Sequence, residues 1–251
     1  MAKRFTDKTV LITGGSSGIG FATAARLRQE GARVVITGRD KEKLDRAAAK
    51  LGDEDQVFPV VSDAANVEDI DYLVSMIERH VGRLDVTFAN AGTGLFKPFT
   101  EFSEADFDQH VATNFKGVFF TIQKVLPLMN RGGAIILNAS WTYHRPMGSA
   151  ALYSATKAAV ANLARTLTTE LADRQIRVNA ISPGYINTPL FNEDQLPEEE
   201  AAWRRGEVPM GRFGRAEEVA NVVAFLASDE ASYVAGQDIL IDGGLVTAKV
   251  E

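Results

Sequence analysis

The chain has 251 residues, of which 45% are hydrophobic and 24% charged, so it is long enough to bury a large core. Its net charge of −6, without any long basic run, argues against nucleic acid as a partner. It contains no cysteine, which excludes disulfides and thiolate chemistry, and its three histidines are too scattered to suggest a metal site. No apolar run reaches membrane-spanning length and the first strand begins almost at once, so we expect a cytoplasmic protein without a signal peptide.

Short β-rich runs alternate with longer helical patterns along the whole chain. This alternation predicts an α/β fold in which a parallel sheet carries helices on both faces. No repeat or linker divides the pattern, so residues 1–251 are expected to form a single domain. The expected strands cover residues 9–12, 33–37, 56–61, 84–89, 134–139, 176–181 and 237–241, and the expected helices cover 21–29, 107–129, 153–171 and 216–227.

The first strand is followed by the glycine-rich run TGGSSGIG at residues 13–20 and then by a helix. Glycines in this position permit a sharp turn and a close approach of backbone to phosphate, and the helix N-terminus offers free N–H groups. No Lys-Ser/Thr pair follows, so the run is not a nucleoside triphosphate loop. The arrangement predicts a dinucleotide site that includes Gly14, Ser16, Ser17, Gly18, Ile19 and Gly20.

The second and third strands end in residues suited to the adenosine part of a dinucleotide. Gly38 leaves space after the second strand, and Arg39 supplies a charge that can pair with a 2′-phosphate, which predicts NADP(H). Two alternatives remain open: Arg39 is solvated while Asp40 only caps the next helix, or Asp40 binds the ribose of NAD. Asp63 and Ala64 follow the third strand, where Asp63 either accepts from the adenine amino group or caps the following helix.

The fourth strand leads into Asn90, Ala91 and Gly92, a turn of small residues that lets the backbone approach the cofactor. Asn90 could equally serve only to link two strand ends. Further on, Asn114 lies among apolar residues of the helix 107–129 and is followed by Gly117, which is consistent with a local irregularity or a bound water. The alternative for Asn114 is an ordinary amide on a helix face.

A hydroxyl, a phenol and an amine come together in the segment 140–157. Tyr153 and Lys157 are four residues apart, so a helix places them on one face, where the ammonium is expected to lower the pKa of the phenol. Ser140 ends an apolar strand and is expected at the carboxyl edge of the sheet, where ligands bind. Together they predict proton exchange with an alcohol or carbonyl oxygen.

Beyond the sixth strand, two prolines and a glycine break the regularity of residues 182–189, and residues 188–212 suggest a lid over the site. The residues expected to form the substrate pocket are mainly apolar and aromatic, which favours a hydrophobic ketone or secondary alcohol. They are Gly94, Leu95, Trp141, Tyr143, His144, Met147, Leu152, Tyr185, Leu190 and Phe191, with His144 in the pocket or at its rim rather than in catalysis.

These motifs, in this order and spacing, resemble the short-chain dehydrogenase/reductase family over the full length of the chain. The runs that carry the resemblance are TGGSSGIG at 13–20, NAG at 90–92, YSATK at 153–157 and PGYINTP at 183–189, together with Asn114 and Ser140. ITGR at 36–39 and TELADRQIRVNAISPG at 169–184 are similar to bacterial NADPH-dependent alcohol dehydrogenases of that family, which reduce a broad range of ketones. One departure is Ala89, where many members have a second asparagine.

The resemblance implies a Rossmann-like, doubly wound sheet of seven strands in the order 3-2-1-4-5-6-7. It implies Tyr153 as the acid/base, Lys157 on the nicotinamide ribose, Ser140 on the substrate oxygen and Asn114 on a water of a proton relay. Pro183, Gly184, Ile186 and Thr188 would lie against the nicotinamide, with Ile186 and Thr188 holding its carboxamide. Most relatives are tetramers, and the helices 115–129 and 153–171 have apolar residues on more than one side, so a homotetramer is expected.

The predicted function is hydride transfer between NADP(H) and a hydrophobic ketone or secondary alcohol. Two alternatives stay open. A ketoreductase acting on acyl thioesters would present basic residues to an acidic carrier, and Arg145, Arg204 and Arg205 leave room for this. A non-catalytic NADPH sensor is the alternative of another class, although it has no need of Tyr153 and Lys157.

Overall fold

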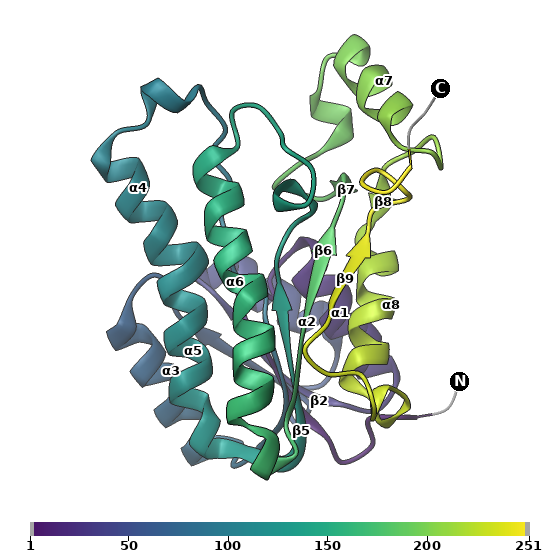
Figure 1. The fold of residues 1–251 in the computed structure, drawn as a ribbon. Coiled ribbons are helices and arrows are strands. Elements are labelled where there is room, and N and C mark those ends of the chain that lie inside the picture. The colour runs from purple at the N-terminus through teal and green to yellow at the C-terminus, as the bar shows by residue number, and fades with distance from the viewer. Residues whose placement is uncertain (1–2, 249–251) are drawn as a thin grey trace.

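The computed structural model describes residues 3–248 and shows a three-layer α/β arrangement (Figure 1). All seven strands of the main sheet run parallel, in the order β3-β2-β1-β4-β5-β6-β9, so the predicted fold class and strand order are confirmed. The strands are β1 (Thr9–Ile12), β2 (Arg33–Gly38), β3 (Val57–Val61), β4 (Leu84–Ala89), β5 (Met129–Asn138), β6 (Arg177–Pro183) and β9 (Asp238–Ile241). Two short strands, β7 (Ile186–Asn187) and β8 (Gly214–Arg215), form a separate pair.

Helices cover both faces of the sheet, and each face has its own apolar core. Alternate residues of a strand point to opposite faces, so Val10 and Ile12 of β1 pack in one core while Leu11 packs in the other. The first core is covered by α1 (Gly18–Gln29), α2 (Lys41–Leu51) and α8 (Ala216–Ala227). The second is covered by α3 (Val67–His80), α5 (Gly117–Val125) and α6 (Ala151–Glu170), the last two lying side by side in Figure 1.

The helix expected over residues 107–129 is interrupted. It consists of α4 (Glu104–Val111), a π turn at Ala112–Lys116 and α5, so the predicted irregularity at Asn114 is present. Its predicted end at Met129 is wrong, because Pro127 lacks a backbone N–H and terminates the helix at a 3-10 turn. Met129 already belongs to β5, which begins earlier than expected.

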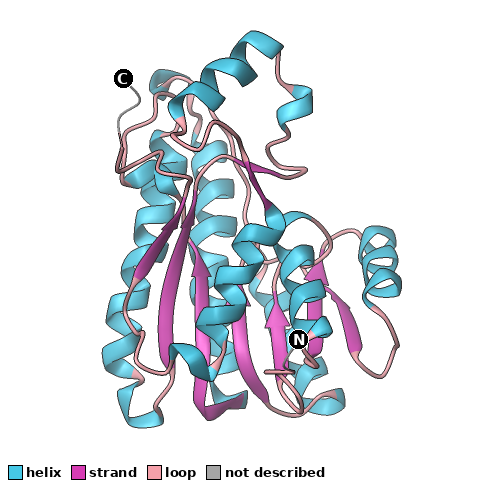
Figure 2. Cartoon of the chain, turned by 90° about the vertical axis from the view of Figure 1, so that its right-hand side faces the viewer, coloured by secondary structure: helices cyan, strands magenta, loops and turns pink. Residues whose placement is uncertain are grey.

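The carboxyl ends of the strands all point to the same edge of the sheet, the upper edge in Figure 2. The segment 188–212 lies at this end and contains α7 (Glu198–Glu207). A third, smaller apolar cluster joins this segment to the sheet through Trp141, Tyr185, Val208, Phe213 and Leu245. Within residues 3–248, no helix is both long enough and apolar enough to cross a membrane.

Candidate active site

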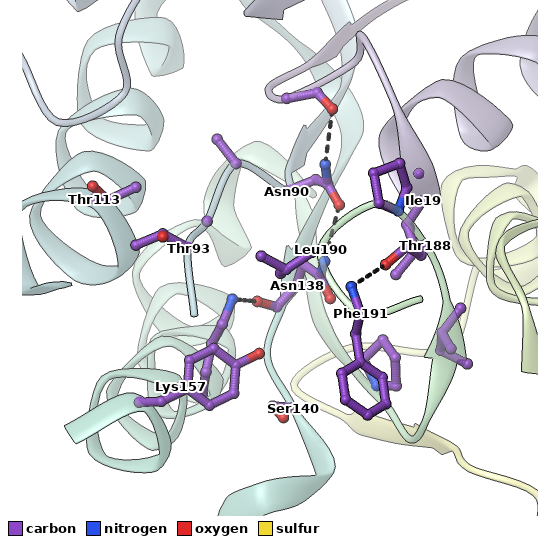
Figure 3. A pocket seen from close by; sticks show the side chains of 18 of the residues that line it. Ile19, Asn90, Thr93, Thr113, Asn138, Ser140, Lys157, Thr188, Leu190 and Phe191 are labelled. Atoms are coloured by element: carbon purple, nitrogen blue, oxygen red, sulfur yellow. Dashed lines mark hydrogen bonds between the residues drawn. The ribbon is translucent and has the colours of Figure 1, made fainter. Parts of the chain in front are cut away.

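One cavity of about 440 Å³ opens at the carboxyl edge of the main sheet (Figure 3). Its wall is formed in turn by the loops that follow β1, β2, β3, β4, β5 and β6. This is the place where open, doubly wound sheets bind ligands, because neighbouring connections leave the sheet in opposite directions there. The sequence motifs that are far apart along the chain therefore face a common space.

The glycine-rich run forms a tight turn between β1 and α1. Gly14 and Gly18 have positive φ angles of 66° and 54°, which side chains rarely tolerate. Ser17 precedes α1 without a side-chain cap, so no side chain from that position occupies the first N–H groups of the helix. Gly20 differs from its neighbours because it does not line the cavity: a Cβ at this position would lie 2.2 Å from the carbonyl oxygen of Gly14. Its role is therefore close packing inside the turn.

The ends of β1, β4 and β5 are linked by side-chain hydrogen bonds. Asn90 Nδ2 donates to the carbonyl of Thr13 at 2.9 Å, and Asn138 Nδ2 donates to Asn90 Oδ1 at 2.9 Å. The backbone N–H of Ala91 donates to Thr13 Oγ1. Asn90 thus links strand ends, as one of its two interpretations proposed, while it also lines the cavity together with Ala91 and Gly92.

Arg39 and Asp63 lie at the end of the cavity that the loops after β2 and β3 form. The Asp40 carboxylate accepts from the N–H of Lys43 at 3.0 Å and caps α2, whereas Arg39 lines the cavity. A Cβ at Gly38 would come within 3.1 Å of Ser16 Oγ, so glycine allows this serine to approach β2. Asp63 accepts from Ala65 N–H in a local turn, while Asn66, rather than Asp63, caps α3.

Tyr153 and Lys157 lie on α6, one turn apart, and Ser140 follows β5. Lys157 Nζ donates to the carbonyl of Asn138 at 2.7 Å and lies 5.8 Å from the centre of the Tyr153 ring (Figure 3). Ser140 Oγ accepts from the backbone N–H of Thr142 at 3.3 Å and lies 3.2 Å from Thr142 Oγ1. All three residues line the cavity.

Burial changes the acidity of both groups on α6. Burial raises the pKa of the Tyr153 phenol, and a hydrogen bond with Ser140 opposes this rise only in part. Burial also lowers the pKa of Lys157 to about 8. The expectation that Lys157 would bring the pKa of Tyr153 below its ordinary value is therefore wrong for this state of the protein, because desolvation of the phenol dominates.

Asn114 lies in the π turn and is completely buried. Its side chain accepts from the N–H of Thr93 at 2.8 Å and donates to the carbonyl of the same residue at 2.9 Å. A Cβ at Gly92 would lie 3.3 Å from Asn114 Oδ1 and 3.4 Å from Lys157 Nζ, so the amide and the ammonium flank this glycine. Asn114 therefore holds the loop after β4 beside Lys157, which is more than an amide on a helix face does.

The other end of the cavity is built in part from the loop after β6. Thr188 lies against the glycine-rich turn, since a Cβ at Gly18 would be 3.4 Å from Thr188 Cβ. The N–H of Phe191 donates to the carbonyl of Thr188 at 3.0 Å, which closes a small loop, and it lies 3.4 Å from Thr188 Oγ1 (Figure 3). Pro183, Gly184, Ile186 and Thr188 all line the cavity, as does Ile19 of the glycine-rich run.

Half of the expected substrate pocket lies at the cavity, and half does not. Trp141, Met147, Tyr185, Leu190 and Phe191 line it. The expectation fails for Tyr143 and His144, because both side chains bind Asp238 of β9, with His144 Nε2 at 2.6 Å from its carboxylate. Gly94, Leu95 and Leu152 are also absent from the lining.

The structure adds Phe96, which no sequence pattern singled out, and Arg204, which the sequence named only as a basic residue for an acidic carrier. Phe96 packs edge to face on Tyr153, with ring centres 5.3 Å apart. Arg204 reaches the cavity from α7. Neither residue belongs to a short motif, although both lie in segments that the sequence associates with the site. Thr37, Ser62, Thr93, Thr113, Asn138, Ala139, Thr142, Ser149 and Pro189 complete the lining.

The fold and this site define a dinucleotide-binding oxidoreductase of the doubly wound class. Sequence similarity to known proteins supports this class. The family model described as enoyl-(acyl carrier protein) reductase matches residues 14–246. A protein from Thermotoga maritima named 3-oxoacyl-[acyl-carrier-protein] reductase FabG is 42% identical, over 97% of this chain and 99% of its own length. Levodione reductase from Leifsonia aquatica is 38% identical, over 96% of this chain and 95% of its own.

Solved structures give the same result. A short-chain dehydrogenase/reductase from Brucella melitensis superimposes with a TM-score of 0.94 at 35% identity, covering 99% of this chain and 100% of that one. The chain belongs to the short-chain dehydrogenase/reductase family. Members of this family are oxidoreductases that use a nicotinamide cofactor, NAD or NADP, and act on small molecules.

Proposed function

We propose that this protein transfers a hydride between NADP(H) and a hydrophobic ketone or secondary alcohol. The observation that carries the proposal is the position of Tyr153, Ser140 and Lys157 on one wall of a cavity that continues to the glycine-rich turn and Arg39. A proton donor, a hydrogen-bond donor and a cation thus share a space with features that suit a dinucleotide.

The residues at the cavity fit such a cofactor. The positive φ angles of Gly14 and Gly18 and the uncapped start of α1 provide a backbone cradle for a pyrophosphate. Asp63 would lie at the adenine, Lys157 at the nicotinamide ribose, and Ile186 and Thr188 at the carboxamide. When bound, the nicotinamide supplies or accepts the hydride.

The protein's own side chains handle the proton. In the reductive direction Tyr153 donates its proton to the carbonyl oxygen, and its raised pKa keeps the phenol protonated at neutral pH. Ser140 donates a hydrogen bond to the same oxygen, because the backbone N–H of Thr142 occupies an acceptor site of its Oγ and leaves its own proton available. The Lys157 ammonium stabilises the phenolate that remains, and Asn114 keeps the adjoining loop in place.

We expect NADP(H) to be preferred over NAD(H). Asp40, the competing ribose ligand, already caps α2, whereas Arg39 faces the cavity with Gly38 leaving space beside it. A guanidinium at this position can make a charge-assisted contact to a 2′-phosphate. Ser16 lines the cavity next to Gly38 and could add a hydroxyl contact to the same group.

A hydrophobic substrate is supported by the wall beside Ser140. Trp141 and Tyr185 meet edge to face with ring centres 5.1 Å apart, and Tyr185 and Phe191 stack at 5.7 Å. Leu190 and Met147 extend this surface. Segment 188–212 would act as the lid over it, since Glu207 of α7 accepts from Tyr185 at 3.0 Å and pairs with Arg145 at 2.5 Å.

An acyl-thioester substrate is the second candidate, because the relative from Thermotoga maritima carries the name of such a reductase. The basic residues near the cavity mouth weigh against an acidic carrier. Arg145 is paired with Glu207, Arg204 with Glu200, and Arg205 with Glu193 and Glu198. Each positive charge thus has a carboxylate partner, which weakens the field that a carrier would meet.

The test is a screen of aryl and alkyl ketones, with the corresponding alcohols and a 3-oxoacyl thioester, against NADPH and NADH. Loss or gain of absorbance by the reduced nicotinamide reports turnover. We expect ketones to be reduced with NADPH at rates well above those for the thioester. Faster thioester turnover would favour the second candidate, and cofactor binding without any turnover would favour a sensor.

We further propose a homotetramer in the cytoplasm. Phe107 of α4 and Phe119 of α5 are exposed at 54% and 39%, and both helices lie on the outer face of the molecule (Figure 1). Exposed aromatic residues on neighbouring helices are typical of a subunit interface. Light scattering at micromolar concentration should give four times the chain's mass of 27.2 kDa, and a monomer mass would exclude this assembly.

A further inference from the structure

Arg204 is unusual among the charged residues of the cavity. Among described residues, four side chains that are charged at neutral pH line the cavity: Arg39, Asp63, Lys157 and Arg204. The first two stand at the ends of β2 and β3, and Lys157 adjoins Tyr153. Only Arg204 stands at the end built from aromatic residues, where its one carboxylate partner, Glu200, lies outside the cavity lining.

The side chain of Arg204 is held in place from two sides. Its exposed fraction is 12%, and its Nε and Nη2 donate to one oxygen of Glu200 at 3.0 and 2.6 Å. Its guanidinium carbon lies 5.2 Å from the ring centres of both Tyr185 and Phe191. Two hydrogen bonds use only part of the five N–H donors of an arginine, so donors remain for another acceptor.

The surroundings of Arg204 suit an anion. Glu200 pairs with Arg204 from outside the cavity lining, and the only carboxylate within the lining, among residues 3–248, is Asp63 at the far end, after β3. An arginine stacked on aromatic rings is weakly hydrated and binds carboxylates through paired hydrogen bonds. Because little water separates the charges at a partly buried site, such a contact is stronger than on the surface.

The aromatic wall connects this arginine to the reacting centre. Trp141 follows Ser140 directly in the chain and contacts Tyr185, and Tyr185 carries Arg204 on its ring. A substrate whose carbonyl lies at Ser140 and Tyr153 would therefore run along Trp141 and Tyr185 before it reaches the guanidinium. We infer that Arg204 selects substrates: the natural substrate is an apolar or aromatic ketone with a carboxylate at the end remote from its carbonyl. This inference rests on the ketone reduction proposed above.

The first experiment compares keto acids with their methyl esters. The probes are phenyl ketones with two, three or four methylenes between the carbonyl and the carboxylate, beginning with 4-oxo-4-phenylbutanoate, each assayed with NADPH. At one chain length the acid should have a KM lower than its ester by about tenfold or more. Equal KM values at every length overturn the inference but leave ketone reduction intact, whereas no reduction of any acid or ester overturns both.

The variants assign the preference to one residue. Arg204→Met keeps a long apolar side chain without the charge. In this variant the KM of the ester divided by the KM of the acid should be close to one. Arg204→Lys keeps the charge and should retain part of the ratio. The matched control is Arg205→Met, because Arg205 is the neighbouring arginine of α7, pairs with Glu193 and Glu198, and does not line the cavity. If Arg204→Met preserved the preference, the inference would be wrong.

A binding measurement without turnover distinguishes a variant that has lost the carboxylate contact from one that has failed to fold. The chain has two tryptophans. Trp141 lines the cavity, and the ring centre of Trp203 lies 5.6 Å from the guanidinium carbon of Arg204. Fluorescence should therefore respond to 4-phenylbutanoate, with half-saturation at about a tenth of the concentration needed for 4-phenylbutanamide. This difference should persist in Arg205→Met and Arg204→Lys and vanish in Arg204→Met. Equal binding of the acid and the amide by the unmodified protein would overturn the inference.

Discussion

The two ends of the cavity are built in different ways. At the end proposed to bind the cofactor, backbone atoms and short side chains at strand ends form the wall, as in the turn of Gly14 and Gly18 and the bonds among Thr13, Asn90 and Asn138. At the substrate end, long side chains from separate loops form the wall through ring contacts and ion pairs. The first end depends on the sheet itself, and the second can be changed by substitution without disturbing it.

Tyr153 lies where the two ends meet, and its removal should have the largest effect. Tyr153→Phe keeps the ring and its contact with Phe96 but removes the donated proton. Turnover should fall by about 100- to 10,000-fold, the range of general acid–base contributions, while the affinity for NADPH stays nearly constant. The control is Tyr143→Phe, because the Tyr143 phenol binds Asp238 outside the cavity. Retained turnover in Tyr153→Phe would mean that another group transfers the proton.

Arg39 tests whether the cofactor end also selects between cofactors. Arg39→Leu should raise the KM for NADPH about ten- to a hundredfold and leave that for NADH little changed, since only the first contact is charge-assisted. Gly38→Asp should reverse the preference, because a carboxylate repels a 2′-phosphate and accepts from a ribose hydroxyl. Steady-state kinetics with both cofactors measure the effect. If the unmodified protein used NADH with the same efficiency as NADPH or a higher one, the role assigned to Arg39 would be refuted.

Gly20 tests how strictly the backbone shapes the cofactor end. In Gly20→Ala the new Cβ would lie 2.2 Å from the carbonyl oxygen of Gly14 if the backbone stayed in place, so the turn must shift. We expect a loss of about 1–3 kcal/mol in the free energy of unfolding, together with weaker cofactor binding. Gly148→Ala is the control, because a Cβ there meets nothing within 4 Å. Urea unfolding of both variants gives the comparison, and two equal losses would contradict the packing role.

Lys157 gives the smallest expected effect on stability, and this effect depends on pH. Its pKa in the folded protein is about 8, below the ordinary 10.5 of an unfolded chain, so burying its charge costs stability. The cost is complete below pH 8 and disappears as the pH rises from 8 to 10.5, where only the unfolded chain keeps the proton. At pH 7, the free energy of unfolding of Lys157→Met should therefore be about 1–2 kcal/mol higher than that of the unmodified protein. This figure allows for the lost hydrogen bond to the carbonyl of Asn138.

Denaturant unfolding at pH 7 and at pH 10 measures this difference, with Lys50→Met on α2 as an exposed control. The advantage of Lys157→Met should shrink at the higher pH, although the variant loses activity at both. An advantage that grew with pH would show that the charge of Lys157 stabilises the fold.

The sequence was most informative at the cofactor end. Alternating strands and helices predict the sheet, and a strand, a glycine turn and a helix in succession predict the phosphate cradle, because backbone geometry depends on local residue types. The four-residue spacing of Tyr153 and Lys157 likewise determines their common face on α6. Such features need no contact with distant parts of the chain.

Contacts between distant segments decided the rest. Tyr143 and His144 are aromatic and close to Ser140 in the chain, yet Asp238 of β9, nearly a hundred residues away, holds them outside the cavity. Arg204 reaches the cavity from α7, and Glu207 of this helix binds Tyr185 of the loop after β6 and Arg145. The pKa of Tyr153 rises because the surrounding side chains exclude water. The number of chain segments that surround a residue depends on the tertiary structure and cannot be predicted from its neighbours in the sequence.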